Sequence, residues 1–310
     1  FKQKTAYEML RSLVGSEMCI RDRKIESLNQ SYYSQNKMAK SFAVIGDPID
    51  HSLSPNIHSA AFRELNLDSS YIGYRIPKEE LEGGVEGLKK IKINGFNVTI
   101  PHKIEMMKYL DKMDESCSII GAVNTVVNNE GVLKGYNTDM DGFLEPLKKR
   151  NITIQNSKVL LIGAGGAARA IVAGIAKEKA GSIDIANRTI EKANNLSEFA
   201  RKLGLSAKVK KIESIDTTIE DYDIIINATS IGLKDEPSPI SFEGINEKTI
   251  VYDIVYAPMN TDFIKKAKAK NAIIIYGYEM LLGQAIRAFE IWHEMKAPYN
   301  AMKKSLLGGF

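Results

Sequence analysis

The sequence predicts an α/β fold, with an N-terminal α/β domain followed by a C-terminal Rossmann-like domain built on a doubly wound parallel sheet. Short apolar runs alternate with amphipathic stretches along the chain, as expected where strands alternate with helices. In the second half these runs are continuously apolar, which is typical of parallel strands buried on both faces. The length of 310 residues suits two domains, and 44% hydrophobic and 26% charged residues are the balance of a globular protein.

Residues 1–37 differ from the rest of the chain because they show no sustained hydrophobic period. They hold seven Lys and Arg against four Asp and Glu, so 35 basic and 34 acidic residues remain for residues 38–310. Most of the net charge of +4 therefore belongs to this segment. We interpret it as a non-native or disordered extension in preference to a functional arm. The nearly neutral remainder has no basic stripe with interleaved aromatic residues, which argues against nucleic-acid binding.

Cysteine usage and hydropathy predict a soluble protein of a reducing compartment. The two cysteines, Cys19 and Cys117, cannot build a disulfide framework, and no group of Cys and His has the spacing of a zinc site. No charge-free apolar run approaches the roughly 18 residues that a membrane helix needs, and no secretory signal is recognised. We expect a cytoplasmic location, no metal and no contact with a membrane.

The first domain, predicted over residues 38–148, contains a series of short apolar runs that indicate strands. These runs lie at residues 42–46, 71–76, 95–100, 122–127 and 131–137. The last two flank Asn128, Asn129 and Glu130, which are typical of a hairpin turn. A polar segment at residues 148–157 then marks the expected domain boundary.

The second domain, predicted over residues 149–276, repeats strand and helix. Its strands are expected in KVLLIGA (158–164), SIDIANR (182–188), DIIINATS (223–230), IVYDIVY (250–256) and AIIIYG (272–277). Residues 277–310 are predicted to form C-terminal helices that pack back toward the first domain. Within them, LGQAIRAFEIWHEM has apolar residues at helical spacing, which indicates a core helix rather than a surface for a partner.

A glycine-rich segment, GAGGAARA at residues 163–170, follows the strand KVLLI and leads into an Ala-rich helix. Gly163 permits a tight turn, Gly165 lets the backbone approach a pyrophosphate, and Ala168 stands where a third glycine would allow close packing of the helix. The N-terminus of the helix offers free N–H groups to the phosphates. Such a motif alone also fits a structural turn, but the strand before it and the helix after it favour dinucleotide binding.

The end of the next strand indicates which dinucleotide is bound. An NAD enzyme usually places Asp or Glu there to bind the ribose 2′-hydroxyl, whereas this chain has Asn187, Arg188 and Thr189, with Lys192 one turn later. A guanidinium binds a 2′-phosphate that a carboxylate would repel. The sequence therefore predicts NADP in preference to NAD, although Arg188 also fits an ordinary solvated residue at the start of a helix.

Polar clusters fall at strand ends or turns in the first domain. They are GDPIDHSLSPNIHSAAF (46–62), GFNVTIPHK (95–103), and GAVNTVV (121–127) with GYNTDMDG (135–142). Taken singly, each has an ordinary structural explanation: Ser52 and Ser54 as caps or turn residues, Lys103 as a surface lysine, and Asp139 as a helix cap. Their meaning comes from their combination.

The joint pattern resembles the shikimate dehydrogenase family from about Phe42 to the C-terminus. The matching motifs are HSLSP (51–55), NVTIPHK (97–103), GAVNT (121–125), GYNTD (135–139), GAGGAARA (163–170), NRT (187–189), NATSIG (227–232) and MLLGQA (280–285). The resemblance implies a substrate-binding first domain and an NADP-binding second domain. It also implies reversible NADP-dependent reduction of 3-dehydroshikimate to shikimate, in the biosynthesis of chorismate and aromatic amino acids. A homodimer is a further expectation.

The resemblance implies that Lys103 and Asp139 are the catalytic pair. Hydride addition to a ketone leaves an alkoxide, so the site needs a proton donor and a nearby positive charge, and a lysine supplies both. Asp139 would orient the ammonium group. The substrate carboxylate would be held by Ser52, Ser54 and Tyr256, and the ring hydroxyls by Thr99, Asn124, Asp139 and Gln284. Cofactor contacts are expected from Gly163, Ala164, Gly165, Gly166, Ala167, Asn187, Arg188, Thr189, Lys192, Thr229, Ser230, Ile254, Gly277 and Met280.

Two alternatives stay open beside this interpretation. One is a quinate/shikimate dehydrogenase with relaxed cofactor use, and the other is a non-catalytic NADP-binding regulatory homologue. The presence of both Lys103 and Asp139 argues against the second, because a binding protein has no need of such a pair. The histidines are interpreted as structural or peripheral; His102 adjoins Lys103 but points elsewhere, since neighbouring side chains alternate on an extended backbone.

Overall fold

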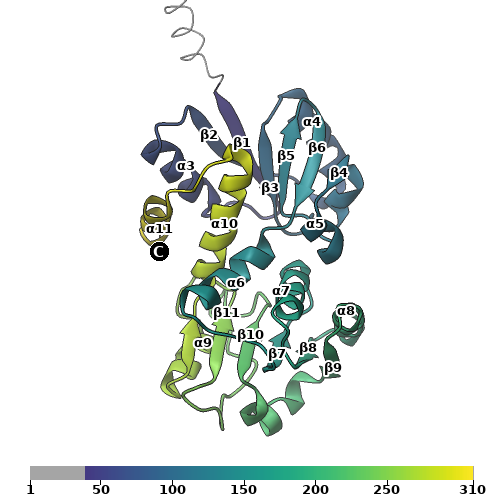
Figure 1. The fold of residues 1–310 in the computed structure, drawn as a ribbon, viewed down its shortest axis with the longest axis vertical. Helices are drawn as coiled ribbons and strands as arrows, with labels where there is room; N and C mark the ends of the chain where they lie inside the picture. The colour runs from purple at the N-terminus through teal and green to yellow at the C-terminus, as the bar shows by residue number, and fades with distance from the viewer. Residues whose placement is uncertain (1–38, 310) are drawn as a thin grey trace, which may run out of the picture. The chain divides into compact units, whose positions relative to one another are not determined.

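The computed structural model describes residues 39–309, which form two six-stranded sheets and the helices around them (Figure 1). The predicted extension at residues 1–37 lies outside the described residues. The two-domain α/β fold expected from the sequence is confirmed. Among residues 39–309, no helix is both long enough and apolar enough to cross a membrane.

The first sheet has mixed strand directions, in the order β2-β1-β3-β5-β6-β4. β1 is parallel to β2 and β3, whereas β5 is antiparallel to β3 and to β6. The strands are β1 (Lys40–Gly46), β2 (Ser69–Arg75), β3 (Gly95–Val98), β4 (Lys112–Met113), β5 (Thr125–Asn129) and β6 (Val132–Tyr136). The helical segments of this part are α3 (Ser54–Glu64), η1 (Lys78–Glu80), α4 (Leu81–Lys90), η2 (Glu105–Tyr109), α5 (Glu115–Ile120) and α6 (Asp139–Lys149). Because β1 and β3 are parallel neighbours, the loops after them meet at one edge of the sheet, where Asp47 N donates to the Ile100 carbonyl at 2.9 Å.

The second sheet is entirely parallel, in the order β12-β11-β10-β7-β8-β9. Counted along the chain from β7, this is the strand order of the dinucleotide-binding fold, in which ligands bind at the carboxyl ends of the central strands where the order reverses. Those strands are β7 and β10. The strands are β7 (Lys158–Ile162), β8 (Ser182–Ala186), β9 (Ser206–Lys210), β10 (Ile224–Asn227), β11 (Ile250–Asp253) and β12 (Ile273–Ile275). The helical segments are α7 (Gly166–Lys177), α8 (Ile190–Lys202), η3 (Ile212–Ser214), η4 (Asp216–Asp221) and α9 (Asp262–Ala269), followed by α10 (Gly277–His293) and α11 (Tyr299–Leu307).

Local sequence signals explain where several helices begin and end. Pro55 occupies the first turn of α3, where its missing N–H is not needed. Asp114 caps α5 by accepting a hydrogen bond from Cys117 N at 2.9 Å, and the helix ends at Gly121 with φ of +67°. Thr261 caps α9 in the same way, by accepting from Ile264 N.

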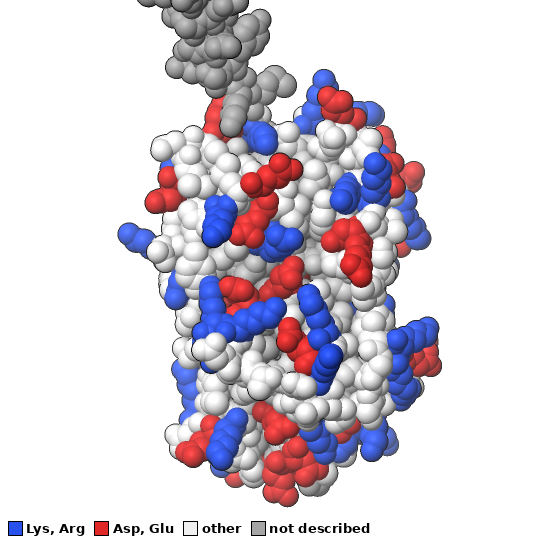
Figure 2. All heavy atoms as spheres, viewed as in Figure 1, with Lys and Arg blue, Asp and Glu red and all other residues white. Residues whose placement is uncertain are grey.

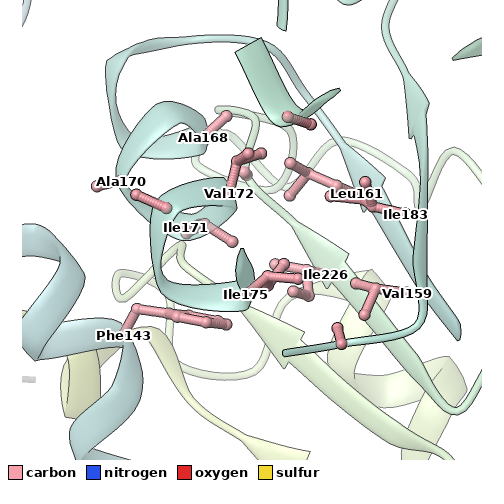
Figure 3. Close-up of a cluster of buried hydrophobic side chains, with 14 of the residues drawn as sticks. Phe143, Val159, Leu161, Ala168, Ala170, Ile171, Val172, Ile175, Ile183 and Ile226 are labelled. Carbon is pink, nitrogen blue, oxygen red and sulfur yellow. The ribbon is translucent and has the colours of Figure 1, made fainter. Parts of the chain in front are cut away.

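An apolar cluster joins α7 to the second sheet. Ile171 and Ile175 of α7 belong to one buried cluster with Val159 and Ile226 of the sheet, as Figure 3 shows. Phe143 of α6 lies in the same cluster, at 1% exposure. Since α6 begins at the first sheet and shares the core of the second, it connects the two halves through buried apolar surface.

The crossing of α6 and α10 depends on two glycines. A Cβ atom on Gly142 would lie 2.6 Å from the Met280 carbonyl oxygen, and one on Gly283 would lie 3.0 Å from the Gly142 Cα. The backbones of the two helices are therefore in direct contact, so a side chain at Gly142 would overlap the α10 backbone and one at Gly283 would be crowded. α10 continues from there to the first sheet, where Trp292 Nε1 donates to the Val126 carbonyl at 3.0 Å.

We expect Gly142→Ala to destabilise the protein, because the added methyl meets a backbone carbonyl that cannot rotate away. The expected loss is about 1 to 3 kcal/mol of unfolding free energy, the usual cost of overpacking. Thermal unfolding followed by circular dichroism measures it. The control is Gly87→Ala on α4, where an added Cβ has nothing within 4 Å; replacing a helical glycine there should be neutral or stabilising. An unfolding temperature for Gly142→Ala equal to that of the unchanged protein would contradict the packing argument.

Some predicted boundaries are wrong. β3 ends at Val98, so Thr99 and Ile100 lie beyond the strand, and β5 begins at Thr125 rather than Ala122. The hairpin between β5 and β6 is confirmed, but its turn is formed by Glu130 and Gly131, both with positive φ. The strand β9 was not expected, since its sequence SAKVK has too few apolar residues to stand out.

Candidate active site

Lys103 and Asp139 form an ion pair between the first sheet and α6. Asp139 is the first residue of α6, and Lys103 lies in the turn between β3 and η2. The Nζ atom of Lys103 donates a hydrogen bond to Oδ2 of Asp139. The two side chains are 15% and 7% exposed, so the pair is shielded from bulk water but remains accessible to a small ligand. In such surroundings the attraction between the charges is stronger than in water.

Asn124 fixes the orientation of this pair from the neighbouring loop. Its Nδ2 donates to Oδ1 of Asp139 at 2.8 Å, and its Oδ1 accepts from Thr138 N at 2.8 Å. The second bond determines which side of the amide faces the carboxylate. The same loop also holds the lysine backbone, because Val123 N donates to the Lys103 carbonyl at 2.8 Å. Asn124 is thus hydrogen-bonded to Asp139, and its neighbour Val123 is hydrogen-bonded to the backbone of Lys103.

A chain of hydrogen bonds continues from Asn124 through Asn97 to Tyr71 of β2. Nδ2 of Asn97 donates to the Asn124 carbonyl at 3.0 Å, and Oδ1 of Asn97 accepts from the Tyr71 hydroxyl at 2.6 Å. Burial raises the pKa of Tyr71, and the nearby Ser54 side chain opposes this rise. Ser54 N donates to Ser52 Oγ at 3.4 Å. Residues predicted from separate motifs therefore belong to one connected network.

Three further predicted substrate residues lie outside this hydrogen-bonded network: Thr99, Gln284 and Tyr256. Thr99 lies against Gly46 at the end of β1. Gln284 lies against Gly142, which is one turn after Asp139 on α6; its backbone N is 2.8 Å from where a Cβ on Gly142 would be. Tyr256 has no hydrogen bond to the serines. Its hydroxyl has no partner within residues 39–309, and burial raises the pKa of Tyr256, which keeps the hydroxyl able to donate.

The buried histidines have structural positions. Nε2 of His102 lies 2.7 Å from the carbonyl of Ile76, directly after β2. His58 stacks on Tyr71 with ring centroids 4.5 Å apart. Burial, together with the nearby His293, lowers the pKa of His58 to about 3, so it is neutral at physiological pH. In the described part of the chain, none of these rings contacts Lys103 or Asp139.

The glycine loop between β7 and α7 has the shape required to receive a phosphate group. Gly163 has φ of +115°, and a Cβ there would lie 2.6 Å from the Ala228 carbonyl, so only glycine fits. Gly165 has nothing within 4 Å of its Cβ position, which leaves its backbone open to a ligand. No side chain caps α7, so the N–H groups of its first turn, starting at Gly166, are free to bind an anion. Ala164 and Ala167 complete this segment with small side chains.

The predicted adenosine-phosphate residues lie beside the glycine loop. Gly163 N donates to the carbonyl of Ala186 at 2.8 Å, which places the end of β8 next to the loop. Asn187 Nδ2 donates to the Thr189 carbonyl at 2.9 Å and thereby shapes the turn into α8. The side chains of Arg188 and Lys192 are exposed, and neither forms an ion pair with another described residue. Both cations are available to a phosphate.

The predicted nicotinamide-side residues come from three segments that meet. Thr229, on the loop after β10, has its Cγ2 atom 3.0 Å from where a Cβ on Gly163 would lie. A Cβ on Gly277, at the start of α10, would be 2.5 Å from the carbonyl oxygen of Ile254 on the loop after β11. Met280 follows on α10 at 6% exposure, whereas Ser230 is exposed beside Thr229. These segments lie at the carboxyl ends of β10 and β11, where the fold binds its ligand. The residues present therefore fit a dinucleotide.

Several residues that connect this site were not identified from the sequence. Asn97 and Thr138 stand inside quoted motifs, and their polar character at strand and helix ends was the available signal. Arg169 had no such signal. Its Nε donates to the Ile120 carbonyl at 2.7 Å, and its guanidinium lies 4.1 Å from the centre of the Phe199 ring. It thereby links the helix after the glycine loop to the segment that leads to Asn124.

Lys103 lies beside the carboxyl edge of the parallel sheet, since its Cδ is 3.5 Å from where a Cβ on Gly166 would be. Ligands of this fold bind at that edge, so the fold and the site define a dinucleotide-binding enzyme. Comparison with known proteins gives the same class. Family models match residues 44–126 (shikimate dehydrogenase substrate binding domain), 146–234 (shikimate / quinate 5-dehydrogenase) and 277–307 (shikimate 5′-dehydrogenase C-terminal domain). The chain belongs to the shikimate dehydrogenase family.

Individual proteins of this family are similar to the chain over most of its length. A shikimate dehydrogenase (NADP(+)) of Nitrosopumilus maritimus (strain SCM1) is 80% identical over 273 residues, which are 88% of this chain and 100% of that protein. The structure of shikimate 5-dehydrogenase from Thermus thermophilus with NADP(H) and shikimate has a TM-score of 0.78 at 34% identity, covering 87% of this chain and 100% of that one. The enzyme from Listeria monocytogenes with shikimate and NAD has a TM-score of 0.81 at 34% identity, covering 87% and 97%.

Proposed function

We propose that the protein is an NADP-dependent shikimate dehydrogenase, which reversibly reduces 3-dehydroshikimate to shikimate. The observation that carries this proposal is the approach of Lys103 to the glycine loop, where its Cδ lies 3.5 Å from the Cβ position of Gly166. The lysine that would donate the proton thus lies beside the segment that would hold the dinucleotide. The reaction would serve the biosynthesis of chorismate and aromatic amino acids, as in the family.

The chemistry follows from the geometry of the ion pair. NADPH, when bound, would supply the hydride that reduces the ketone. As the carbonyl oxygen becomes an alkoxide, Lys103 would stabilise it with its positive charge and donate a proton from Nζ. Asp139 keeps Nζ in place, and Asn124 keeps Asp139 in place, so the donor is oriented before the reaction starts. In the oxidative direction, the same groups would receive the proton of the shikimate hydroxyl.

Substrate recognition would depend on neutral donors for the carboxylate. Ser54 is the first residue of α3, where the helix N-terminus favours a negative charge, and Ser52 lies beside it. Tyr256 would reach the same group with its unpaired hydroxyl. Thr99, Asn124 and Gln284 would bind ring hydroxyls, and a site of this kind rejects analogues that lack one, since its polar groups would be left unpaired.

Steady-state kinetics test this proposal and its alternatives. We expect reduced-nicotinamide absorbance to rise when shikimate and NADP⁺ are added, with a higher kcat/KM than for quinate or for NAD⁺. If quinate were oxidised as fast as shikimate, and NAD⁺ were used as fast as NADP⁺, the quinate/shikimate enzyme with relaxed cofactor use would be favoured. NADPH binding without turnover of either substrate would favour the non-catalytic homologue and refute the proposal.

Arg188→Ala should weaken the use of NADP⁺ and not that of NAD⁺. The guanidinium would bind the 2′-phosphate, and losing a hydrogen bond between charged groups costs about 1.5 to 3 kcal/mol, equivalent to a KM about 10- to 150-fold higher. KM values for both dinucleotides at saturating shikimate measure the effect. Lys202→Ala at the far end of α8 is the control. A parallel rise in KM for NAD⁺ would mean that Arg188 supports the loop rather than the phosphate.

We further propose that the enzyme acts in the cytoplasm on a small-molecule substrate and forms a homodimer. On the face drawn in Figure 2, Lys and Arg alternate with Asp and Glu instead of merging into one basic area, which supports a small ligand over nucleic acid. β2 is at the edge of the first sheet, with Ile72 and Tyr74 exposed, so a second copy could pair with it. Sedimentation velocity distinguishes a dimer from a monomer.

Among residues 39–309, no three side chains of metal-ligating type are grouped as an ion would require.

A further inference from the structure

Asp253, the last residue of β11, is a carboxylate with 0% exposure. It forms no ion pair with any Lys, Arg or His of the described residues. Burial raises the pKa of Asp253 to about 6, although hydrogen bonds from Thr261, Val255 and Asn227 lower it. The group therefore depends on hydrogen bonds alone, since an unpaired buried charge is costly in a protein interior. Its position at the carboxyl edge of the second sheet suggests a use for it.

Three donors hold the carboxylate in one orientation. Oδ1 accepts from Asn227 Nδ2 at 2.9 Å and from Val255 N at 3.0 Å, and Oδ2 accepts from the Thr261 hydroxyl at 2.6 Å. Oδ1 receives a backbone N–H, which can only donate, so this oxygen is an acceptor whether or not the group is ionised. Asn227 must therefore present its NH₂ group to Asp253, and its Oδ1 is turned toward the other side.

That other side is the loop after β10. Oδ1 of Asn227 accepts from the Thr229 hydroxyl at 2.6 Å and from Thr229 N at 3.1 Å. The Thr229 hydroxyl oxygen then accepts from Ile231 N at 3.0 Å. The orientation that Asp253 imposes on one amide therefore fixes the position of Thr229, which is predicted to contact the nicotinamide end of the cofactor.

Asp253 also shapes its own loop. The bond from Val255 N to Oδ1 closes a turn in which a side chain binds the backbone two residues later. Ile254 N donates at the same time to the Asn227 carbonyl at 3.0 Å. These two bonds fix the backbone directly before Tyr256. The loops after β10 and β11 are thus held to each other through one carboxylate and one amide.

We propose that Asp253 is a positioning residue of the active site, which acts through Asn227 to hold the loops carrying Thr229 and Tyr256 where the nicotinamide end of the cofactor and the substrate meet. The inference rests on the proposed dehydrogenase function. Asp253 touches neither ligand itself. Its effect should therefore be confined to the nicotinamide end, and the adenosine end, read by Arg188, should be unaffected.

The test compares Asp253→Asn with the unchanged full-length chain. An asparagine has nearly the same shape, but it cannot accept from all three donors. We expect KM for NADP⁺ to rise about tenfold, as for the loss of a well-formed hydrogen bond, and kcat to fall severalfold. The inhibition constant of adenosine 2′,5′-bisphosphate, which has no nicotinamide, should stay within about twofold. Asp223→Asn, at the amino end of β10, is the matched control and should leave all three values unchanged.

A double-mutant cycle shows whether Thr229 transmits the effect. If it does, Asp253→Asn and Thr229→Ala together should raise KM for NADP⁺ by less than the product of the single effects. A KM within twofold of the unchanged protein for Asp253→Asn, multiplicative effects in the cycle, or an equal rise in the inhibition constant of adenosine 2′,5′-bisphosphate would each overturn the inference.

If Asp253→Asn does not fold, Thr261→Val and Thr261→Ser replace it. The valine variant, which loses the donor to Oδ2, should raise KM for NADP⁺ and the serine variant should not; equal values would overturn the inference.

Failure of this inference is distinct from failure of the proposed function. An unchanged protein that does not oxidise shikimate with NADP⁺ refutes the function. An active protein whose Asp253→Asn variant has normal kinetics refutes only the role of Asp253.

Discussion

Lys103→Ala is expected to lower kcat for shikimate oxidation by about 10²- to 10⁴-fold, the contribution typical of a positioned acid or base. The change removes both the proton-transferring group and the positive charge beside the developing alkoxide. KM for shikimate should change much less, because the carboxylate and most ring hydroxyls are assigned to other residues. Steady-state kinetics over a range of shikimate concentrations separate the two effects.

The control for this variant is Lys108→Ala. Lys108 lies on η2, its side chain is 70% exposed, and within residues 39–309 its ion pair is with Glu105. Its removal should leave kcat and KM at the values of the unchanged protein. If Lys103→Ala turned over shikimate at the original rate, another group would have to be the proton donor, and Lys103 would be a binding residue at most.

Asp139→Asn is expected to have the second largest effect, with kcat lowered by about 10²-fold and KM for shikimate raised. The substitution keeps the shape of the side chain but removes the charge that holds Lys103 Nζ. The new side chain has one oxygen and one NH₂ group, so it can no longer accept from both Asn124 Nδ2 and Lys103 Nζ at separate oxygens. Proton transfer then starts from a lysine that is no longer held in one place.

Asp141→Asn provides the comparison on the same helix. Asp141 is two residues further along α6, its side chain is 44% exposed, and its nearest cation is Arg287 at 3.7 Å. Kinetic constants within twofold of the original are expected for this variant. A kcat for Asp139→Asn as high as that of Asp141→Asn would show that the ion pair is structural and not catalytic.

The sequence predicts the parts of the molecule that depend on local pattern. Five of the six parallel strands of the second sheet, the turn at Gly163 and the helix after it follow from residues that are close in the chain. The polar motifs around Lys103 and Asp139 were also recognisable, but only in combination, because each residue taken singly has an ordinary structural explanation. The roles of the individual site residues remain predictions that the variants above test.

Contacts between distant positions could not be predicted in the same way. The hydrogen bond between Tyr71 and Asn97 spans 26 positions, and the pair of Arg150 with Glu279 spans 129. Arg169 lies inside the glycine motif, yet its partner is a carbonyl on α5. No periodicity identifies such pairs, because they exist only once the chain is folded and depend on how α6, α7 and α10 are arranged.

The order in which the chain is synthesised gives a further meaning to the path of α10. Trp292 and Phe289 of α10 and Met302 of α11 share a core with Phe42 and Ile57, near the other end of the described chain. During translation, one face of the first sheet therefore stays uncovered until the last residues are made, although its other buried cluster uses only residues 43–133. The second sheet has all its strands before α10 is made. We expect the cofactor-binding half to become protease-resistant on the ribosome before the substrate-binding half. Pulsed proteolysis of stalled nascent chains that end before α10 can determine that order.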